Sequence, residues 1–222
     1  PPYYVDFFDR YGFTKFFDRY AFYYDLSKPV TKRFEESVAL LKKRYHFRTR
    51  ILNLKKLDQE LVGIQKLLVR SWPEDWPDMV PPSLPEIQDE VNKLLPVADQ
   101  DLLVVAEDAQ GEIVGLAIAL PDYNQVFKKL NGRLFPIGFI KFLLYKKKIN
   151  GGRSLILMVD PDYHNKGVSA AMYLHMFQSA LKKGYKCGEG STIHEFNTKM
   201  VNDAIRAGGD LYKIYRIYRK DL

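Results

Sequence analysis

A polar turn between a predicted strand and a predicted helix carries the clearest chemical signal in the sequence. The apolar run Ser154–Val159 is followed by Asp-Pro and then by the turn "HNKG" at residues 164–167. The first N–H groups of a helix have no intrahelical acceptors and carry partial positive charge, which suits a phosphate group. Gly167 allows the backbone to approach such a ligand closely, and Lys166 adds positive charge. An ordinary strand-to-helix connection is the alternative interpretation.

The signatures of other catalytic sites are missing from the sequence. The four histidines lack the paired spacing of metal ligands, and Cys187 is the only cysteine, so we expect no metal site and no internal disulfide. The segment "GEGST" lacks the final glycine of the Gly-x-Ser-x-Gly pattern that marks a serine nucleophile. The polar turn is therefore the main candidate site.

The composition indicates a basic, globular chain. Its 222 residues carry a formal net charge of +7, and 46% of them are hydrophobic. The basic residues are scattered and form no zinc-finger, RNP or recognition-helix pattern. We therefore interpret them as surface charge that also attracts an anionic cofactor. Binding to nucleic acid or to a membrane surface is the alternative.

The sequence predicts a cytoplasmic location. The longest apolar run, Leu134–Tyr145, contains Lys141 and is too short to span a membrane. No signal peptide is visible, and the single cysteine fits a reducing compartment. The chain begins with Pro-Pro rather than with Met, so we interpret it as part of a longer protein.

Hydrophobic periodicity predicts the strands and helices that position the turn. Leu57, Leu61, Ile64 and Leu68 recur at helical spacing, whereas the five prolines within residues 71–85 indicate a loop. The other predicted elements are a helix within 27–45, a strand at 46–52, a helix at 85–95, a β-hairpin around 108–111, an insertion at 121–150 and a strand at 186–191. This order predicts a mixed α/β fold.

The strand and the helix on either side of the turn have predicted buried faces. Ser154–Val159 is continuously apolar, as expected for a central strand that is covered on both faces. Ala170, Leu174, Phe177 and Leu181 recur at i, i+4, i+7 and i+11, which predicts one stripe that faces the sheet. The turn is then expected at the edge of a sheet, where it begins a well-anchored helix.

Residues 3–26 and 199–222 align with each other without a gap. Each segment has the pattern of a helix, a glycine and a strand, and the glycines, Gly12 and Gly208, fall at the same place. A shared layout of this kind indicates an internal repeat. We interpret the two segments as copies of one structural unit.

The turn and the element order together resemble the GNAT superfamily of acyl-CoA-dependent N-acyltransferases. The pyrophosphate loop of that family reads Gln/Arg-x-x-Gly-x-Gly/Ala, and residues 164–169 read His-Asn-Lys-Gly-Val-Ser. The central Gly167 is kept, while His164 replaces Gln/Arg and Ser169 replaces Gly/Ala. The lead-in "VDPDYHNKG" resembles the family's Val-x-Pro-x-Tyr-x-x-x-Gly. The resemblance covers about residues 47–222 and implies a mixed, mostly antiparallel twisted sheet flanked by helices.

The end of the chain adds a second point of resemblance. GNAT domains often carry Asn-x-x-Ala-x-x-x-Tyr-x-x-x-Gly-Phe on their fourth helix, and Asn197 and Gly208 keep this spacing. In the first copy of the repeat, Gly12-Phe13 fits the end of the pattern. The chain therefore resembles the C-terminal part of a tandem GNAT-like bacterial protein. Residues 1–45 are predicted to close a preceding domain and to link it to a GNAT-like domain at 46–222.

The resemblance implies an acyl-CoA co-substrate, with acetyl-CoA favoured, and no metal. In the family, backbone groups of the fourth strand hydrogen-bond the pantetheine arm, and the amides of the loop hold the pyrophosphate. The corresponding positions in this sequence are Leu157, Met158, Val159, His164, Asn165, Lys166, Gly167, Val168, Ser169, Ala170 and Asn197.

The family's usual proton donor is missing from this sequence. In GNAT enzymes a tyrosine on the fourth helix often protonates the departing thiolate, but that spacing falls on Ala204 and, in the first copy, on Phe8. The substitutes that we consider are Glu189 as the base and Tyr212, Tyr215 or Tyr218 as the acid. Each also has an ordinary interpretation, as a solvent-facing strand residue or a cross-strand aromatic.

The acceptor pocket is predicted at Trp72 and Trp76, in the loop where GNAT enzymes usually build it, and at His194. The two tryptophans can equally belong to a packed surface loop, and the histidine can simply be solvated. For the insertion at residues 121–150 three interpretations stay open. It covers the thioester end of the cofactor, rests on a membrane, or forms a helix that packs on the core.

These residues favour an acyl-CoA-dependent N-acyltransferase that acts on an unidentified primary amine. A GNAT fold that binds CoA or another small ligand without transferring an acyl group is the alternative. A basic module that binds nucleic acid or a membrane surface is the third hypothesis. The expected partners are CoA and a small-molecule amine, and a homodimer is the assembly that we consider.

Overall fold

The chain folds into two compact units in the computed structural model. The structure describes residues 3–28, 30–72, 80–133, 135 and 137–221. The larger unit comprises residues 25–188, and the smaller unit comprises residues 1–24 together with residues 189–222. Each unit is described by itself.

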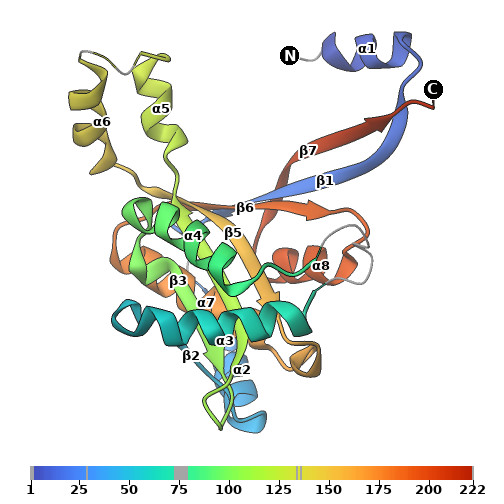
Figure 1. Ribbon diagram of the computed structural model, residues 1–222. Coiled ribbons are helices and arrows are strands. Elements are labelled where there is room, and N and C mark those ends of the chain that lie inside the picture. The colour runs from blue at the N-terminus through green and yellow to red at the C-terminus, as the bar shows by residue number, and fades with distance from the viewer. Residues whose placement is uncertain (1–2, 29, 73–79, 134, 136, 222) are drawn as a thin grey trace. The chain divides into compact units, whose positions relative to one another are not determined.

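The larger unit is an antiparallel sheet with helices on both faces (Figure 1). Its strands follow the order β2-β3-β4-β5 and are β2 (Arg48–Ile51), β3 (Leu103–Glu107), β4 (Ile113–Pro121) and β5 (Gly151–Val159). Its helices are α2 (Lys32–Arg44), α3 (Leu57–Arg70), α4 (Leu84–Leu94), α5 (Asn124–Leu130), α6 (Gly138–Lys146) and α7 (Val168–Lys182). The predicted mixed α/β class, with mostly antiparallel strands flanked by helices, is confirmed.

Helices α3 and α4 cover one face of this sheet and form its main core (Figure 1). Leu61 and Ile64, which the helical spacing had placed on one stripe, are both buried. On β3, Leu103 and Val105 pack into this core, and Val104 between them points to the opposite face because side chains alternate along a strand. The core residues are Leu52, Leu61, Ile64, Leu67, Ile87, Leu103, Val105, Ile113 and Leu116.

Helix α7 packs on the opposite face of the sheet and also contacts α2. A Cβ added at Gly115 of β4 would lie 2.9 Å from Val168 Cγ1 and 3.0 Å from Met172 Sδ, so the helix lies directly on the strand backbone. The buried side chains of α7 therefore include Val168, Met172 and Met176, whereas Leu181 is exposed. The predicted single stripe was wrong, because a helix that packs on both a sheet and another helix buries more than one row of side chains.

Strand β5 is present as predicted, but it is not covered on both faces. Leu155 is 44% exposed and Ile156 is 37% exposed. The helices on the sheet pack mainly over β3 and β4. An apolar sequence does not predict how far the covering helices extend over the neighbouring strand. The prediction of a fully covered central strand was therefore wrong.

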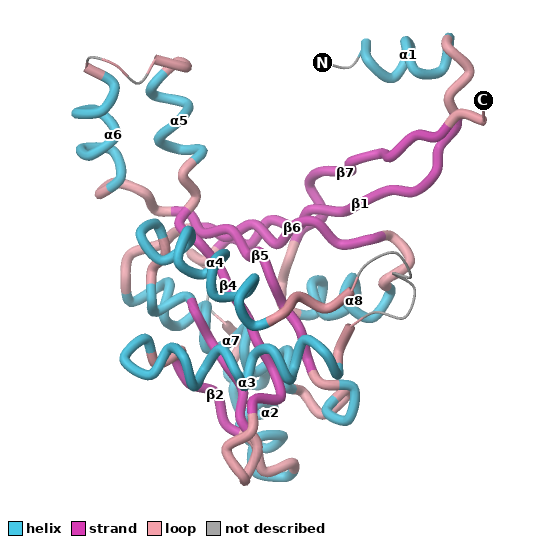
Figure 2. The backbone as a smooth tube through the Cα atoms, in the orientation of Figure 1, coloured by secondary structure: helices cyan, strands magenta, loops and turns pink. Residues whose placement is uncertain are grey.

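The insertion at residues 121–150 is a hairpin of two short helices, α5 and α6, between the end of β4 and the start of β5 (Figure 2). The two helices contact each other through aromatic rings, with the centroids of Phe127 and Phe142 6.4 Å apart. Val126 and Leu130 of α5 are buried, but the only buried residue of α6 is Gly138. The alternative of a core-packing helix is therefore wrong for α6.

The smaller unit contains the two segments that resemble each other in sequence. Its strands follow the order β6-β1-β7, and β1 pairs with β7 antiparallel. These strands are β1 (Thr14–Asp25), β7 (Asp210–Arg219) and β6 (Cys187–His194), which begins in the larger unit. The helices of the unit are α1 (Tyr3–Arg10) and α8 (Thr198–Arg206).

The two copies of the repeat end their helices in the same way. Phe13 N donates to Phe8 O at 3.0 Å, and the aligned Gly209 N donates to Ala204 O at the same distance. Each helix is followed by a glycine in the left-handed conformation that commonly ends a helix. These glycines are Gly12 (φ +77°) and Gly208 (φ +86°). Equivalent hydrogen bonds at aligned residues support the interpretation of an internal repeat.

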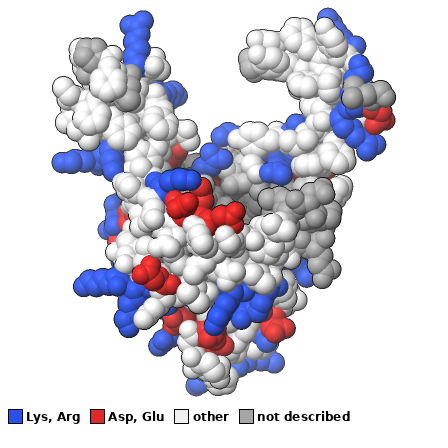
Figure 3. Space-filling model, viewed as in Figure 1, with Lys and Arg blue, Asp and Glu red and all other residues white. Residues whose placement is uncertain are grey.

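Charged side chains of both signs are spread over the visible surface, with lysines and arginines among acidic residues (Figure 3). In the described part of the chain, no three His, Cys, Asp or Glu side chains are grouped in a way that suits a metal ion. Among the helices of the described residues, none has the length and the apolar character that are needed to cross a bilayer.

Candidate cofactor loop and candidate catalytic cluster

The polar turn forms a tight loop at the start of α7. It begins with the 3₁₀ turn Pro161–Tyr163, and Gly167 is the residue immediately before the helix. Ala171 N donates to Gly167 O at 3.0 Å, which is the first backbone hydrogen bond of the helix, and no side chain caps this end. The N–H groups of the first turn therefore have the arrangement that binds anions in proteins.

Gly167 is needed both for its conformation and for the space around it. Its φ of +81° lies in the left-handed region, and an added Cβ would lie 2.5 Å from Leu41 Cδ1. Leu41 belongs to α2, so this helix supports the loop from the side. A side chain at position 167 must therefore displace Leu41 as well as adopt a strained backbone conformation.

We expect Gly167→Ala to lower the free energy of unfolding by about 2–4 kcal/mol, because backbone strain and overpacking both contribute. Gly184 provides a matched control, since its φ is +83° and an added Cβ would meet nothing within 4 Å. Gly184→Ala is expected to show the strain alone, about 1–2 kcal/mol. The double variant Gly167→Ala, Leu41→Ala should lose less stability than the sum of the two single losses, because the smaller side chain at position 41 leaves room for the added Cβ. Urea unfolding measures the wild type, the three single variants and the double variant, and equal losses at the two glycines would contradict the contact with Leu41.

Two predicted cofactor-binding residues are held in place by neighbouring groups. His164 Nε2 lies 3.1 Å from Val159 O, and because a carbonyl only accepts, the proton of this contact is on Nε2. The Lys166 ammonium lies 4.8 Å from the ring centroid of Tyr163 and 5.8 Å from that of Tyr45. These cation–π contacts keep a positive charge beside the start of α7.

The other predicted cofactor-binding residues lie on β5, in the loop or on the first turn of α7. Leu157, Met158 and Val159 are half-buried on β5 and pair with β4. Asn165 has a positive φ of 61°, and Val168 is buried against β4. Ser169 and Ala170 follow Val168 in the first turn of α7.

An ion pair that the sequence analysis did not predict holds the beginning of the loop. Arg70 Nε lies 2.7 Å from Asp160 Oδ2, and only 7% of the Asp160 side chain is exposed. The other carboxylate oxygen of Asp160 accepts from Asp162 N at 3.0 Å, and Arg70 Nη2 donates to Ile113 O at 3.1 Å. The end of α3, the start of β4 and the loop are therefore tied together. The signal in the sequence was the aspartate of "VDPDY", but its partner is a tertiary contact.

Two of the predicted catalytic residues are in contact in the smaller unit. The hydroxyl of Tyr212 donates to Glu189 Oε2, and Ser191 Oγ donates to Glu189 Oε1 at 2.6 Å. Lys213 Nζ lies 2.8 Å from the Tyr212 hydroxyl and 3.3 Å from Glu189 Oε2. A carboxylate, a phenol and an ammonium group are thus brought together, which is a set that can accept, donate and stabilise a proton. We call these three residues the Glu189 cluster.

A β-bulge explains why Tyr212 and Lys213 both reach the same carboxylate. In the pairing of β1 with β7, Lys213 lies opposite Ala21 and Leu211 lies opposite Phe22, which leaves Tyr212 as an extra residue. A bulge turns neighbouring side chains out of the regular alternation of a strand. The sequence analysis did not consider Lys213, which would point away from Tyr212 in a regular strand.

The structure also shows local partners for two predicted residues, one at the end of β6 and one after it. His194 stacks near Phe17, with ring centroids 4.3 Å apart, and its Nδ1 accepts from Phe196 N at 3.3 Å. Asn197 accepts from Met200 N at 3.1 Å and caps α8. Both side chains therefore have local structural partners, and their roles in binding stay predictions.

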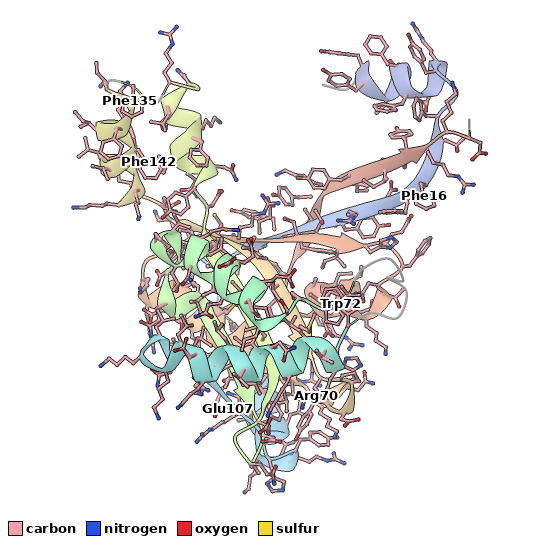
Figure 4. The ribbon with its side chains drawn as sticks, in the orientation of Figure 1. Phe16, Arg70, Trp72, Glu107, Phe135 and Phe142 are labelled. Atoms are coloured by element: carbon pink, nitrogen blue, oxygen red, sulfur yellow. The ribbon has the colours of Figure 1, made fainter. Side chains whose placement is uncertain are left out.

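Two of the remaining predicted residues, Trp72 and Tyr215, lie in the described part of the chain. Trp72 is half-buried and follows the end of α3, close in sequence to Arg70 (Figure 4). Trp76 lies outside the described residues. Tyr215 is on β7 opposite Arg19 and is 40% exposed.

No protein-family model matches the chain. Among curated proteins, the chain is 29% identical over 180 residues to the bacterial ceramide synthase of Caulobacter vibrioides, which covers 78% of this chain and 46% of that protein. It is 25% identical over 232 residues to protein YghO of Escherichia coli, which covers 100% of this chain and 57% of that protein. The chain thus spans about half the length of these two relatives.

Solved structures with the same fold cover nearly the whole chain. The GCN5-related N-acetyltransferase of Sphaerobacter thermophilus matches with a TM-score of 0.65 at 12% identity, over 99% of this chain and 56% of that one. A tandem GNAT protein from the clavulanic acid biosynthesis pathway matches with a TM-score of 0.62 at 10% identity, over 98% of this chain and 58% of that one. The chain has the fold of the GCN5-related N-acetyltransferases, or GNAT fold.

Proposed function

We propose that the chain is an acyl-CoA-dependent N-acyltransferase. The observation that carries this proposal is the loop at residues 164–170, which begins α7 in a chain with the GNAT fold. Gly167 opens the backbone of the loop, and Lys166 supplies a positive charge, as the pyrophosphate of CoA requires. The likeness to solved N-acetyltransferases supports an acyl-CoA donor and an amine acceptor.

In the proposed reaction the amine nitrogen attacks the carbonyl carbon of the thioester, so a C–N bond forms and the C–S bond breaks. We assign the carboxylate of Glu189 as the base that takes a proton from the amine. The Tyr212 hydroxyl gives its proton to the departing thiolate, and Lys213, 2.8 Å away, stabilises the phenolate that results. The proton on Glu189 then returns to Tyr212 through their hydrogen bond, which restores both groups.

The acceptor that we propose is a primary amine on a long hydrophobic chain. This finer assignment rests on the relative at 29% identity, whose name is that of a ceramide synthase, because ceramide is an amide of a long-chain amine. Release of free CoA from palmitoyl-CoA and from acetyl-CoA tests it, with sphinganine and spermidine as alternative acceptors. Turnover with sphinganine only is the expected result. Turnover with spermidine only would overturn the acceptor assignment while leaving the N-acyltransferase proposal intact.

Reversing the charge of Lys166 tests the role of the loop. We expect Lys166→Glu to weaken CoA binding by about tenfold or more, because a carboxylate next to the pyrophosphate is worth roughly 1.4 kcal/mol or more in binding. Lys56→Glu is the matched control, since Lys56 is an exposed lysine just before α3. Isothermal titration of CoA into the three proteins measures the effect. No binding of CoA by the wild type at millimolar concentration would make the loop an ordinary strand-to-helix connection and would overturn the enzyme proposal.

CoA binding without acyl transfer is the second candidate function. The observation that favours it is Ala204, which is completely buried on α8 at the position where the resemblance places the family's tyrosine. An alanine has no proton to give to the thiolate. Under this alternative, wild-type protein binds CoA in the titration but releases no CoA from acyl-CoA with any amine offered.

A further inference from the structure

The hairpin of α5 and α6 exposes a large apolar surface. Among the described residues of the hairpin, seven apolar side chains are 50–78% exposed. They are Phe127, Phe135, Ile137, Phe139, Ile140, Leu143 and Leu144, and we call them the hairpin patch. Scattered apolar residues are normal on a protein surface, but so many exposed apolar side chains on one short hairpin indicate a surface that binds something.

The patch is a consequence of how α6 packs on α5. Phe142 lies against α5, with its ring centroid 6.0 Å from that of Tyr123 and 6.4 Å from that of Phe127 (Figure 4). Because successive residues of a helix are about 100° apart, the outward residues of α6 occupy about 140° of its circumference, turned away from Phe142. These outward residues are Phe139, Ile140, Leu143 and Leu144.

The charged residues of the hairpin segment are all positive. Between Asp122 and Asp160 the sequence contains no acidic residue. The basic residues in this interval are Lys128, Lys129, Arg133, Lys141, Lys146, Lys147, Lys148 and Arg153. On α6 the helical spacing places Lys141 on one side of the apolar stripe and Lys146 on the other. In Figure 3 the hairpin shows uncharged side chains with basic ones at its margins.

We propose that the hairpin docks the protein on the surface of an anionic lipid bilayer. An apolar stripe with lysines on both sides has the composition of a helix that lies in the plane of a membrane interface. The nine residues of α6 make a helix of about 14 Å, which is too short to cross a hydrocarbon core of about 30 Å. The lysines then contact anionic headgroups while the apolar side chains enter the boundary of the acyl chains.

A bilayer fits the hairpin better than the other occupants of an apolar surface. A second copy of the chain would bring the basic residues of two hairpins together, and like charges oppose that contact. Nucleic acid would match the lysines but would leave the aliphatic side chains without apolar partners. An anionic bilayer satisfies both the charge and the apolar stripe.

Flotation with lipid vesicles tests the proposal. Wild-type protein is expected to float with vesicles of mixed phosphatidylglycerol and phosphatidylcholine, and to stay behind with vesicles of phosphatidylcholine alone. Ile140→Ser with Leu144→Ser removes two exposed side chains of the patch and should lower the partition coefficient at least tenfold. Leu40→Ser with Val69→Ser is the matched control, because these residues are 65% and 51% exposed on α2 and α3. The control should float like the wild type.

The role of the charge is tested separately. Lys128→Glu with Lys141→Glu should abolish the preference for anionic vesicles, and salt should weaken wild-type binding in the same direction. Circular dichroism shows whether each variant is folded. The proposal fails if the wild type does not float with anionic vesicles, or if the serine pair floats as well as the wild type. It also fails if light scattering shows a dimer that only the serine pair dissociates, because the patch would then bind a second copy.

The docking surface is independent of the proposed enzyme activity. Isothermal titration of CoA needs no lipid, and the serine pair at Ile140 and Leu144 should bind CoA as the wild type does. If the protein floats with anionic vesicles but does not bind CoA, the docking proposal is supported and the enzyme proposal is contradicted. If it binds CoA but does not float, the enzyme proposal stands and the docking proposal is contradicted.

Discussion

Glu189→Gln is expected to lower kcat/KM for acyl transfer by about 10²–10⁴-fold, which is the usual contribution of a positioned general base. The amide of glutamine keeps the shape of the carboxylate, and its one oxygen can still accept from Tyr212 or from Ser191, but it does not take a proton from an amine. Release of the free thiol of CoA measures the rate. CoA affinity in the titration should stay within about twofold of the wild type, because the substitution removes no group from the loop.

The neighbours of Glu189 supply the controls for this prediction. Tyr212→Phe removes the proposed acid and should also lower the rate, whereas Ser191→Ala removes one hydrogen bond to Oε1 and should cost about tenfold or less. A structural role for Glu189 would instead lower the stability of the variants and leave the pH dependence of the rate unchanged. A folded Glu189→Gln protein with the wild-type rate would remove this residue from the mechanism without touching the evidence for the cofactor loop.

Arg50→Ala is expected to lower the free energy of unfolding by about 3 kcal/mol, because it leaves two buried carboxylates without their main partner. Arg50 Nη1 lies 2.8 Å from Glu60 Oε1, and Arg50 Nε donates to Glu107 Oε1 at 2.6 Å. The side chains of both glutamates are 7% exposed or less, and Figure 4 shows Glu107 at the end of β3. Urea unfolding at neutral pH measures the change.

Arg48→Ala is the matched control for Arg50→Ala. Arg48 also contacts Glu107, with Nη2 2.9 Å from Oε2, but its side chain is 74% exposed. A largely exposed ion pair contributes little, so we expect a loss of about 1 kcal/mol or less. Equal losses for the two arginines would show that burial does not govern this network.

The same network predicts how stability depends on pH. Burial raises the pKa of Glu107, but the hydrogen bonds from Arg50 and Arg48 outweigh it, and the pKa lies below the ordinary value of 4.5. A carboxyl whose pKa is lower in the folded state stabilises the protein above the unfolded pKa, and this stabilisation is lost as the pH falls through the folded pKa. Wild-type stability should therefore decrease as the pH falls below about 4.5. Arg50→Ala should show a weaker decrease, because the main group that lowers the pKa is gone.

The sequence by itself determined the features that depend on local backbone chemistry. The order of helices and strands, the turn at residues 164–167 and the glycine ends of α1 and α8 all followed from periodicity and residue type. Gly167 is an example, because the same small residue that marks the turn in the sequence adopts a left-handed φ in the structure. The charge pattern of the insertion at 121–150 was also visible in the sequence.

Only the tertiary structure decided which side chains meet and which faces are covered. Tyr212 and Lys213 reach Glu189 because a bulge shifts the register of β7 against β1. The residue types of β7 do not predict that shift. Arg70 at the end of α3 pairs with Asp160 after β5, and α6 exposes its apolar stripe because Phe142 is on the side that it turns toward α5. Periodicity reports that a face is apolar, but the partner that covers it is a property of strand register and helix packing, which involve residues far apart in the chain.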